Sequence, residues 1–312
     1  MSARRLLPTA FIVAVAVPLA RAESVATVTA VRGEVSAVAA GTGEARALTA
    51  APDTGRIAGG ALGSGDEVRT GAGASATLLF PDGSLVRLEE STRLSVEERP
   101  LPGTPVPGRK TVKRTLALRE GRIRCDAKPN TPVYTSIRTP LGVVGVRGTQ
   151  LTVSITGGRF QVAVESGKVF VMDTPGRAVF DLGSGQTVQL EVNERQQLVG
   201  QVLADGGGSV VATIGNARVR MEGGAIIRVS GIAGERLSVT ALSGNVTVSY
   251  PATGKTETVP TGQTVPVLGP DAPPGLPPVG EGAAAAGAPD RGVPATYEMP
   301  IIRDTIEGSP YK

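Results

Sequence analysis

Apolar and polar residues alternate with period two along much of the chain, which is the pattern of half-buried β-strands. The clearest stretch is 138–171, where glycines separate short alternating runs and Gly157-Gly158 permits a tight reversal. The runs expected to form strands here are Val143–Val146, Leu151–Ile155, Phe160–Val164 and Val169–Val171. No side chain in this stretch points to catalysis, so the pattern predicts a scaffold.

The same alternation predicts further strands upstream. Residues 25–38 are expected to form a strand pair bent at Gly33, residues 39–61 a loop, and Asp66–Gly71 a turn. Ala76–Phe80 and Leu85–Leu88 are expected to form a hairpin.

The hairpin connection is Pro81-Asp82-Gly83, an order of residues that favours a type I turn. Asp82 is therefore expected to form the turn rather than to bind a ligand.

A proline-rich stretch, residues 99–115, interrupts the strands. With its basic pairs Arg109-Lys110 and Lys113-Arg114, it is interpreted as a solvated surface loop, and a patch for anionic glycans or lipids is the alternative. Strand structure resumes at Leu116, with Arg119, Arg122 and Arg124 expected on the exposed face. Cys125 is in register with Ile123 and is expected to face the core.

Several short motifs occur in a fixed order along these predicted strands. They are Gly65-Asp66, Arg69-Thr70-Gly71, Asp82-Gly83-Ser84, Thr139-Pro140-Leu141-Gly142, Val146-Arg147-Gly148-Thr149 and Gly167-Lys168-Val169. Together they resemble the signature of the FecR-type domain, which is named for the periplasmic regulator of ferric citrate uptake, and the resemblance covers about residues 25–195.

The resemblance implies an all-β fold, with short strands in a solenoid-like or sandwich arrangement. In the family's regulators, a cytoplasmic N-terminal segment holds a sigma factor and the periplasmic domain senses an outer-membrane receptor. Only residues 1–5 precede the first apolar run here, so anti-sigma activity is not expected to carry over. The signature residues Arg147 and Thr149 are expected to maintain a turn.

The N-terminus has the features of an export signal. Arg4 and Arg5 precede an apolar run from Leu6 to Leu19, and Ala20-Arg21-Ala22 supplies small residues at both positions that signal peptidase reads. Residues 1–22 are therefore expected to be removed after Ala22, leaving no stable membrane span and placing the mature protein in the periplasm or at the cell surface. An uncleaved membrane anchor is the alternative.

The second half of the chain repeats parts of the first. Ser166–Val171 is echoed by Ser243–Val248, and Gly185–Val188 by Gly262–Val265, both at an offset of 77 residues. We interpret this common offset as the duplication of a strand-rich unit, and chance similarity of strand and turn sequences is the alternative.

The expected domains follow from this pattern: a FecR-type domain at 25–195, a degenerate second repeat at 208–266, and a disordered linker and tail at 267–312. The linker is rich in proline, alanine and glycine, which cannot bury enough surface to fold. The tail holds a small apolar cluster that could add a strand to a sheet: Tyr297, Met299, Ile301 and Ile302.

Composition limits the chemistry. The chain has no histidine, which excludes Ser-His-Asp and Cys-His nucleophiles and the usual zinc sites, so neither a cofactor nor a metal is expected. Polysaccharide hydrolysis needs only two carboxylates, and candidates exist at Asp66, Glu67, Asp82, Glu89 and Glu90. The chain has no tryptophan to stack on sugars, however, and turns or exposed strand faces explain these acids, so no enzyme is expected.

Charge adds little. Removal of residues 1–22 takes away three arginines and no acids, which leaves 29 basic residues against 28 acidic ones and gives no support for nucleic-acid binding. The sequence thus favours a non-catalytic module that binds a protein or polysaccharide of the cell envelope, in an unknown oligomeric state. The alternatives are a membrane-anchored component that regulates a sigma factor through a separate partner, and a polysaccharide-acting enzyme.

Overall fold

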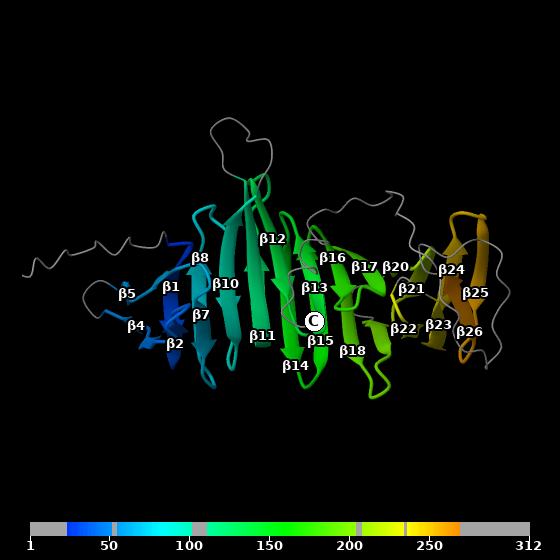
Figure 1. Cartoon of the computed structure of the whole chain (residues 1–312), viewed down its shortest axis with the longest axis horizontal. Coiled ribbons are helices and arrows are strands. Elements are labelled where there is room, and N and C mark those ends of the chain that lie inside the picture. Colours follow the sequence, from blue (N-terminus) through cyan, green and yellow to red (C-terminus); the bar gives the residue numbers. More distant parts are fainter. Residues whose placement is uncertain (1–23, 52–54, 102–110, 204–207, 234–235, 269–312) are drawn as a thin grey trace, which may run out of the picture.

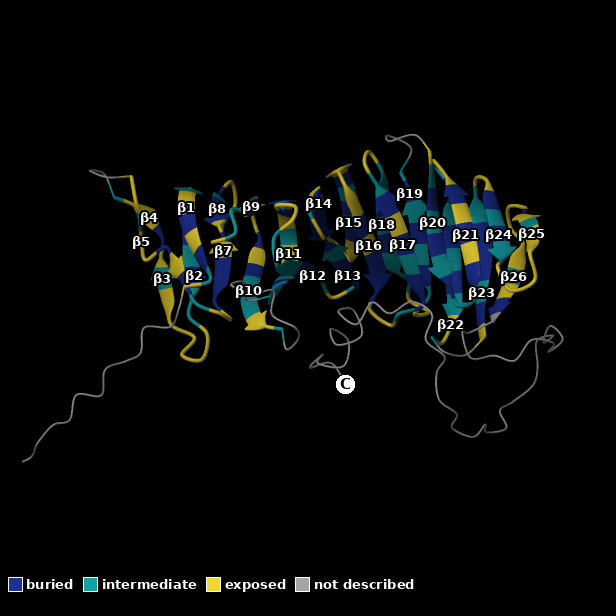
Figure 2. Cartoon of the chain, turned by 90° about the horizontal axis from the view of Figure 1, so that it is seen from above, coloured by how far each residue is buried: buried dark blue, intermediate teal, exposed yellow. Residues whose placement is uncertain are grey.

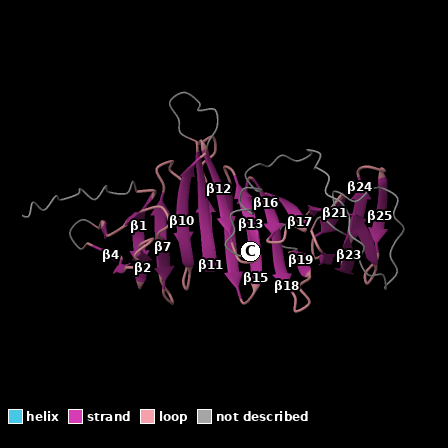
Figure 3. Cartoon of the chain, viewed as in Figure 1, coloured by secondary structure: helices cyan, strands magenta, loops and turns pink. Residues whose placement is uncertain are grey.

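The computed structural model describes residues 24–51, 55–101, 111–203, 208–233 and 236–268. Within these ranges every regular element is a β-strand, and Figure 3 shows strands joined by loops throughout. The strands stand side by side along one long axis, from β1 at one end to β26 at the other (Figure 1). The prediction of an all-β fold is confirmed.

Two long sheets, which we name sheet A and sheet B, share a single core. Across sheet A, the strands in order are β6 (Ala61–Leu62), β1 (Ala26–Arg32), β8 (Ser75–Leu79), β9 (Leu85–Leu88), the second half of β11 (Val112–Asp126), β14 (Gln150–Thr156), β15 (Arg159–Ser166), β18 (Thr187–Val192), β19 (Leu198–Val202), β22 (Ile226–Gly231), β23 (Arg236–Ser243) and β26 (Thr264–Leu268).

Sheet B is built in the same way. Its strands in order are β3 (Ala45–Ala47), β2 (Val35–Val38), β7 (Glu67–Thr70), β10 (Arg93–Pro100), the first half of β11, β12 (Val133–Arg138), β13 (Gly142–Val146), β16 (Lys168–Asp173), β17 (Ala178–Gly183), β20 (Ser209–Ile214), β21 (Ala217–Glu222), β24 (Val246–Tyr250) and β25 (Lys255–Val259). A separate two-stranded ribbon consists of β4 (Thr49–Ala50) and β5 (Ile57–Ala58).

The core lies between the sheets and consists mainly of valine, leucine, isoleucine and alanine. Figure 2 shows the cause: buried and exposed bands alternate along the strands, because successive side chains point to opposite faces. Phe160 and Phe180 are among the largest fully buried side chains, and each lies against a glycine, Gly142 and Gly200. In a core of small branched residues, a phenylalanine ring thus fits where the facing position has no side chain, and the space between the sheets stays filled.

From β14 onward the chain lays down hairpins alternately in the two sheets. The hairpins β14–β15, β18–β19 and β22–β23 belong to sheet A, and β16–β17, β20–β21 and β24–β25 belong to sheet B. Each hairpin also pairs with the next hairpin of its own sheet. The arrangement is therefore repetitive along the long axis, as in a solenoid.

Strand β11 belongs to both sheets. Its first half pairs with β10 and β12 in sheet B, and its second half pairs with β9 and β14 in sheet A. The chain turns from one sheet to the other at Gly121, whose φ is +93°. A Cβ at this position would lie 2.3 Å from Thr92 Oγ1, so only glycine fits the bend.

The crossings between the sheets change ends at this point. Before β11, the crossings at Gly33, Gly71 and Ser91 lie beside Gly121 and are joined to one another by Gly71 N–H to Glu34 O and Ser91 N–H to Gly71 O, whereas the crossing from β6 to β7 lies at the other end of β7. After β11 they lie at the opposite end, where Ala127 N–H donates to Thr149 O at 3.0 Å. Each end of the sandwich therefore has one stretch of crossings and one stretch of hairpin tips.

Four expectations for the N-terminal half are wrong. The strand pair at 25–38 does not form, because Gly33, with a φ of +72°, carries the chain across to the other sheet and β1 and β2 lie in different sheets. The expected loop at 39–61 contains β3, β4 and β5, and the expected turn Asp66–Gly71 is largely strand β7. The expected loop at 99–115 is shorter, since β10 reaches Pro100 and β11 starts at Val112.

Other expectations are confirmed. The strands expected within 138–171 are β13 to β16, and the hairpin expected from Ala76 to Leu88 is β8–β9. Arg119, Arg122 and Arg124 are exposed. Cys125 is 2% exposed in the core, and burial raises the pKa of its thiol to about 12, although the Arg114 charge opposes this shift.

Strand pairing continues across the boundary expected between 195 and 208, through β18–β19 and β17–β20. The segments related by the offset of 77 residues occupy equivalent places: β16 and β24 both open a hairpin of sheet B, and Gly185 and Gly262 both precede a strand of sheet A. Duplication itself stays a prediction. Residues 1–22 lie outside the described residues, as does the tail beyond β26.

We predict that Gly121→Ala destabilises the protein far more than Gly157→Ala. Both glycines have positive φ, +93° and +57°, but a Cβ on Gly157 would have nothing within 4 Å, whereas a Cβ on Gly121 would meet Thr92. The expected losses in the free energy of unfolding are about 3 kcal/mol and about 1 kcal/mol. Urea denaturation measures both, and equal losses would show that the bend at Gly121 tolerates a side chain.

Candidate binding site

The signature residues lie at turns and crossings, and they do not converge on one point. Asp66, directly before β7, is 7% exposed and holds three segments together. Its carboxylate accepts the N–H groups of Ala40 at 2.9 Å and Gly63 at 3.1 Å, and it forms an ion pair with Arg46 at 3.2 Å. Gly65 beside it has a φ of +93°.

Thr70 and Gly71 connect neighbouring crossings. The Thr70 hydroxyl donates to Glu89 O at 2.6 Å and accepts from Thr92 N–H at 2.9 Å. Gly71 N–H donates to Glu34 O at 2.9 Å. Arg69, the other residue of this motif, is paired with Glu67 on the same strand. The motif therefore stabilises the end of the sandwich where β11 bends.

Thr149 and Gly167 do the same at the opposite end. The Thr149 hydroxyl lies 3.2 Å from Arg147 O and 3.1 Å from Lys168 O, and a Cβ on Gly167 would come within 2.8 Å of that hydroxyl. Gly148 has a φ of +62°. Arg147 itself is exposed, with its guanidinium carbon 5.8 Å from the centre of the Tyr134 ring.

Asp82-Gly83-Ser84 forms the tip of the β8–β9 hairpin, as expected, and also holds a buried arginine. The side chain of Arg114 is 2% exposed. Its Nη2 lies 3.1 Å from Asp82 Oδ1, its Nε 2.7 Å from Glu98 Oε1, and its guanidinium carbon 3.7 Å from the centre of the Phe80 ring. We call Phe80, Asp82, Ser84, Glu98 and Arg114 the arginine cluster.

Opposing effects set the pKa of Asp82. Burial alone would raise it, but the Arg114 guanidinium and the hydrogen bonds from Ser84, including the hydroxyl at 2.8 Å, hold it below its usual value. Arg114 was expected in a solvated loop. It stands in register with Leu116 and Leu118, so the period-two pattern already placed it on the inward face.

Thr139-Pro140-Leu141-Gly142 forms the tip between β12 and β13. Thr139 Oγ1 accepts the N–H of Gly142 at 3.0 Å and that of Leu141 at 3.3 Å. A Cβ on Gly142 would lie 2.5 Å from Met172 O and 2.8 Å from the Phe160 ring, so glycine is required there for close packing. Pro140 is exposed at this turn, whereas Leu141 is half-buried and packs against the core.

Two hollows flank Pro140 and Leu141, and both are lined by these two residues. The first has a volume of about 700 Å³ and the second about 680 Å³. We name the two together the tip groove, because hairpin tips form most of its walls. The first hollow is completed by Glu89–Ser91, 119–122 and 155–158, and the second by 174–175, Arg177, Val192, Gln196 and 231–233.

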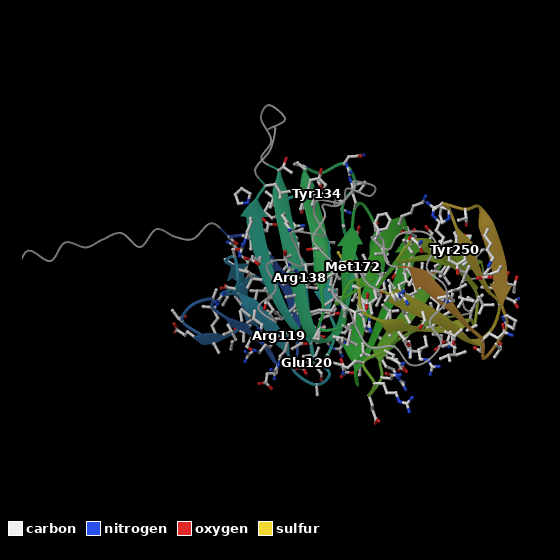
Figure 4. All side chains as sticks on the ribbon, turned by 45° about the vertical axis from the view of Figure 1, so that its right-hand side comes forward. Arg119, Glu120, Tyr134, Arg138, Met172 and Tyr250 are labelled. Atoms are coloured by element: carbon white, nitrogen blue, oxygen red, sulfur yellow. The ribbon has the colours of Figure 1, made fainter. Side chains whose placement is uncertain are left out.

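The first hollow carries charged groups that are paired. Glu89 lies 3.5 Å from Arg122, Glu120 lies 2.8 Å from Arg93, and Glu90 accepts the N–H of Gly73 at 2.7 Å. Figure 4 shows Arg119 and Glu120 at the end of the strands opposite to Tyr134. The walls are therefore polar but largely neutralised.

The second hollow has a more apolar lining than the first. Ile232 is 63% exposed there, the most exposed of the large apolar side chains in the described part of the chain. Arg177, which also lines this hollow, donates to Gln196 O at 2.6 Å and pairs with Asp173 at 2.8 Å. Asp173 is fully buried and also accepts the N–H of Ala178. Sequence reasoning missed this pair, although Asp173 continues the inward register of Val169 and Val171.

The carboxylates that the sequence offered for hydrolysis do not form one site. Asp66 and Asp82 fasten turns, Glu67 pairs with Arg69, and only Glu89 and Glu90 line the tip groove. Among the described residues, no group of three or more acids and cysteine could hold a metal ion. The described residues also include no helix that is long and apolar enough to cross a membrane.

Residues 66–170 match the family described as FecR protein. The chain contains a FecR domain. The match is shorter than the expected 25–195, and all of the signature motifs except Gly65 fall within it. FecR proteins are periplasmic or membrane-associated regulators, which supports a regulatory role in signal transduction for this chain.

Two crystal structures of a candidate anti-sigma factor from Parabacteroides distasonis ATCC 8503 also align with the chain. Both alignments have 21% sequence identity and cover 44% of this chain and 59% of the other, with TM-scores of 0.34 and 0.35. The chain thus spans less than two thirds of the length of these neighbours. Among curated proteins, none matches the chain.

We predict that loss of Arg114 alone destabilises the protein strongly, because its partners stay buried. Arg114→Met leaves the carboxylates of Asp82 and Glu98 buried without their cation, at a cost of about 3 to 5 kcal/mol. The matched control is Arg99→Met, which removes an exposed pair with Glu97 and should change stability little. Urea denaturation at pH 7 measures both, and equal effects would contradict the prediction.

The same cluster gives a pH dependence. Because the pKa of Asp82 is lowered in the folded state, its contribution to stability is full above the unfolded value of about 3.9 and is lost as the pH falls through the lower folded value. The destabilisation by Asp82→Asn, measured by urea denaturation across this pH range, should therefore be large at pH 7 and shrink below about pH 4.

Proposed function

We propose that this protein is an exported, non-catalytic regulatory module that binds a protein partner of the cell envelope through the tip groove of its FecR domain. The observation that carries the proposal is the position of the signature turn: Pro140 and Leu141 form the ridge between both hollows. The remaining signature residues support the two ends of the sandwich and leave this turn as the part of the signature directed at the groove.

The shape and lining of the groove favour a protein over a small ligand. The walls come from several separate turns, and they combine exposed apolar groups, such as Ile232, with charges that already have partners, such as Glu120 and Arg122. An apolar centre with a neutralised polar rim is typical of a protein–protein interface. Small-molecule pockets instead enclose most of their ligand.

The expected export signal determines where the protein would act. The expected signal segment 1–22 would deliver the chain to the periplasm or the cell surface, where FecR proteins act. A cleaved chain would receive signals only from exported partners. An uncleaved chain would remain in the membrane and would pass a signal to a separate cytoplasmic protein.

The first experiment addresses the N-terminus. We predict that the protein from fractionated cells begins at Glu23, and N-terminal sequencing with intact-mass measurement checks this. Ala22→Arg should block processing because signal peptidase requires a small residue there, while the control Ala22→Ser should be processed. An intact Met1 in the inner-membrane fraction would overturn the cleaved form of the proposal.

The second experiment addresses the groove. A photo-crosslinking amino acid at Ile232 should give one adduct with an envelope protein in cells, identified by mass spectrometry. The control position is Leu85, which is 36% exposed and does not line the groove. Ile232→Asp should then weaken binding of that partner at least about tenfold, with stability unchanged, because the side chain is largely exposed. The same adduct from both positions, or none, would overturn the proposal.

A further inference from the structure

The outer face of sheet B carries an apolar patch that the core does not explain. On β16, Val169 and Val171 point inward and are 1% and 0% exposed, so Phe170 and Met172 point outward. Strand register places Val143 and Val179 on either side of Met172. In the row of Phe170 it places Asp181 next to Phe170 and Val211 beyond Asp181. We name Val143, Phe170, Met172, Val179 and Val211 the outer patch.

Sheet A has no such patch at the equivalent place. The outward positions of β15, β18 and β19 form a row of amides, Gln161, Gln189 and Gln201, which are paired in register. The two sheets share one core and the same hairpin geometry, so the difference lies in the sequence of the outer faces alone. The outer face of sheet A shows that this fold allows polar side chains at such positions. Apolar side chains on the outer face of sheet B therefore indicate that another segment or molecule covers them.

The burial of the patch is uneven. Phe170 is 36% exposed, whereas Met172 is 7% exposed although it does not belong to the core cluster. Arg138 lies in the same row as Met172, with Val143 of β13 between them. Burial lowers the pKa of Arg138, although the Glu97 charge opposes this shift and the Arg99 charge adds to it. This part of the outer face is therefore partly withdrawn from water.

We propose that the outer patch is the docking surface of the chain's own C-terminal segment, residues 296–303. In that segment Tyr297, Met299 and Ile301 alternate with other residues, so an extended chain presents all three on one side. These side chains match the patch in chemistry, because Met299 offers a flexible thioether and Tyr297 offers a ring, and both can pack against Met172 and Phe170.

The connection is long enough. Residues 269–295 join β26 to this segment, and a flexible chain of that length spans about 30 Å on average. The patch strand β16 lies five strands from the C-terminal edge of sheet B, through β17, β20, β21 and β24 to β25, which is about 24 Å at 4.8 Å per strand. Because β26 is the edge strand of sheet A, the linker must also pass from one sheet to the other, which adds about 10 Å at right angles to this distance.

Charge also favours this occupant. Basic side chains flank the patch: Arg138 on one side and Arg218 and Arg220 on the other. The docking segment 296–303 carries one acid, Glu298, and one base, Arg303, and two further acids, Asp304 and Glu307, follow directly after it. A tethered segment has an effective concentration of the order of 1 mM, which gives it an advantage over a second copy or a free partner. The inference does not depend on the tip groove, which lies at the hairpin tips.

The test uses the absence of tryptophan from the chain. Phe170→Trp creates a single fluorescent reporter in the patch of the otherwise complete mature chain. Replacing Tyr297, Met299, Ile301 and Ile302 together by serine should shift its emission to the red and raise acrylamide quenching about twofold, because the ring loses its cover. Leu85→Trp, on the outer face of sheet A and equally 36% exposed, is the control and should not respond.

Added peptide of the sequence 294–305 should reverse the shift in the serine variant. In the Phe170→Trp protein with the unsubstituted tail, dilution over a hundredfold range should leave the tryptophan emission unchanged, as an intramolecular contact requires. An emission that ignores the tail substitutions, or one that changes on dilution because a second copy covers the patch, would overturn the proposal. Circular dichroism confirms that each variant is folded.

Discussion

The structure depends on how the chain crosses between its two sheets. A sandwich of alternating hairpins needs a crossing after every hairpin, and each crossing must reverse the chain tightly while leaving no buried backbone group without a partner. Gly121, Gly148 and Gly167 supply left-handed conformations, and Thr70, Thr92 and Thr149 supply hydroxyls that bond to the backbone of neighbouring crossings. The crossings thus form a connected column at each end, and most of the FecR signature belongs to these columns.

This constraint explains what the sequence could and could not predict. Period-two alternation identified β13 to β16 and β8–β9, because half-buried strands expose their register directly. It could not tell a glycine that returns the chain within a sheet from one that carries it across. Gly33 was therefore interpreted as a hairpin bend, although in the structure it packs against Ala74 of the neighbouring crossing, directly before β8, whose Cβ lies 2.9 Å from a Cβ placed on Gly33.

The candidate site was predictable only in part. The motif around Pro140 and Leu141 was found, but the groove arises from turns that are distant in sequence, such as those near Gly121 and Ile232, and no local pattern joins them. The prediction for Arg114 was wrong for a different reason. Composition suggested a solvated basic loop, while the register with Leu116 pointed inward, and the register was the better guide because Asp82 and Glu98 compensate the buried charge.

The tip groove and the outer patch meet at one hairpin end. Gly142 follows the Pro140-Leu141 ridge, and its backbone packs against the carbonyl of Met172 and the ring of Phe160 so closely that no side chain fits between them. β13 is also paired with β16 along its whole length, from Gly142 with Asp173 to Val146 with Val169. A displacement of the ridge would therefore have to move the strand that carries Met172, or break that pairing. Since a packed sheet resists small continuous deformation, occupancy of the groove can influence the patch only through a discrete change in the β13–β16 pair.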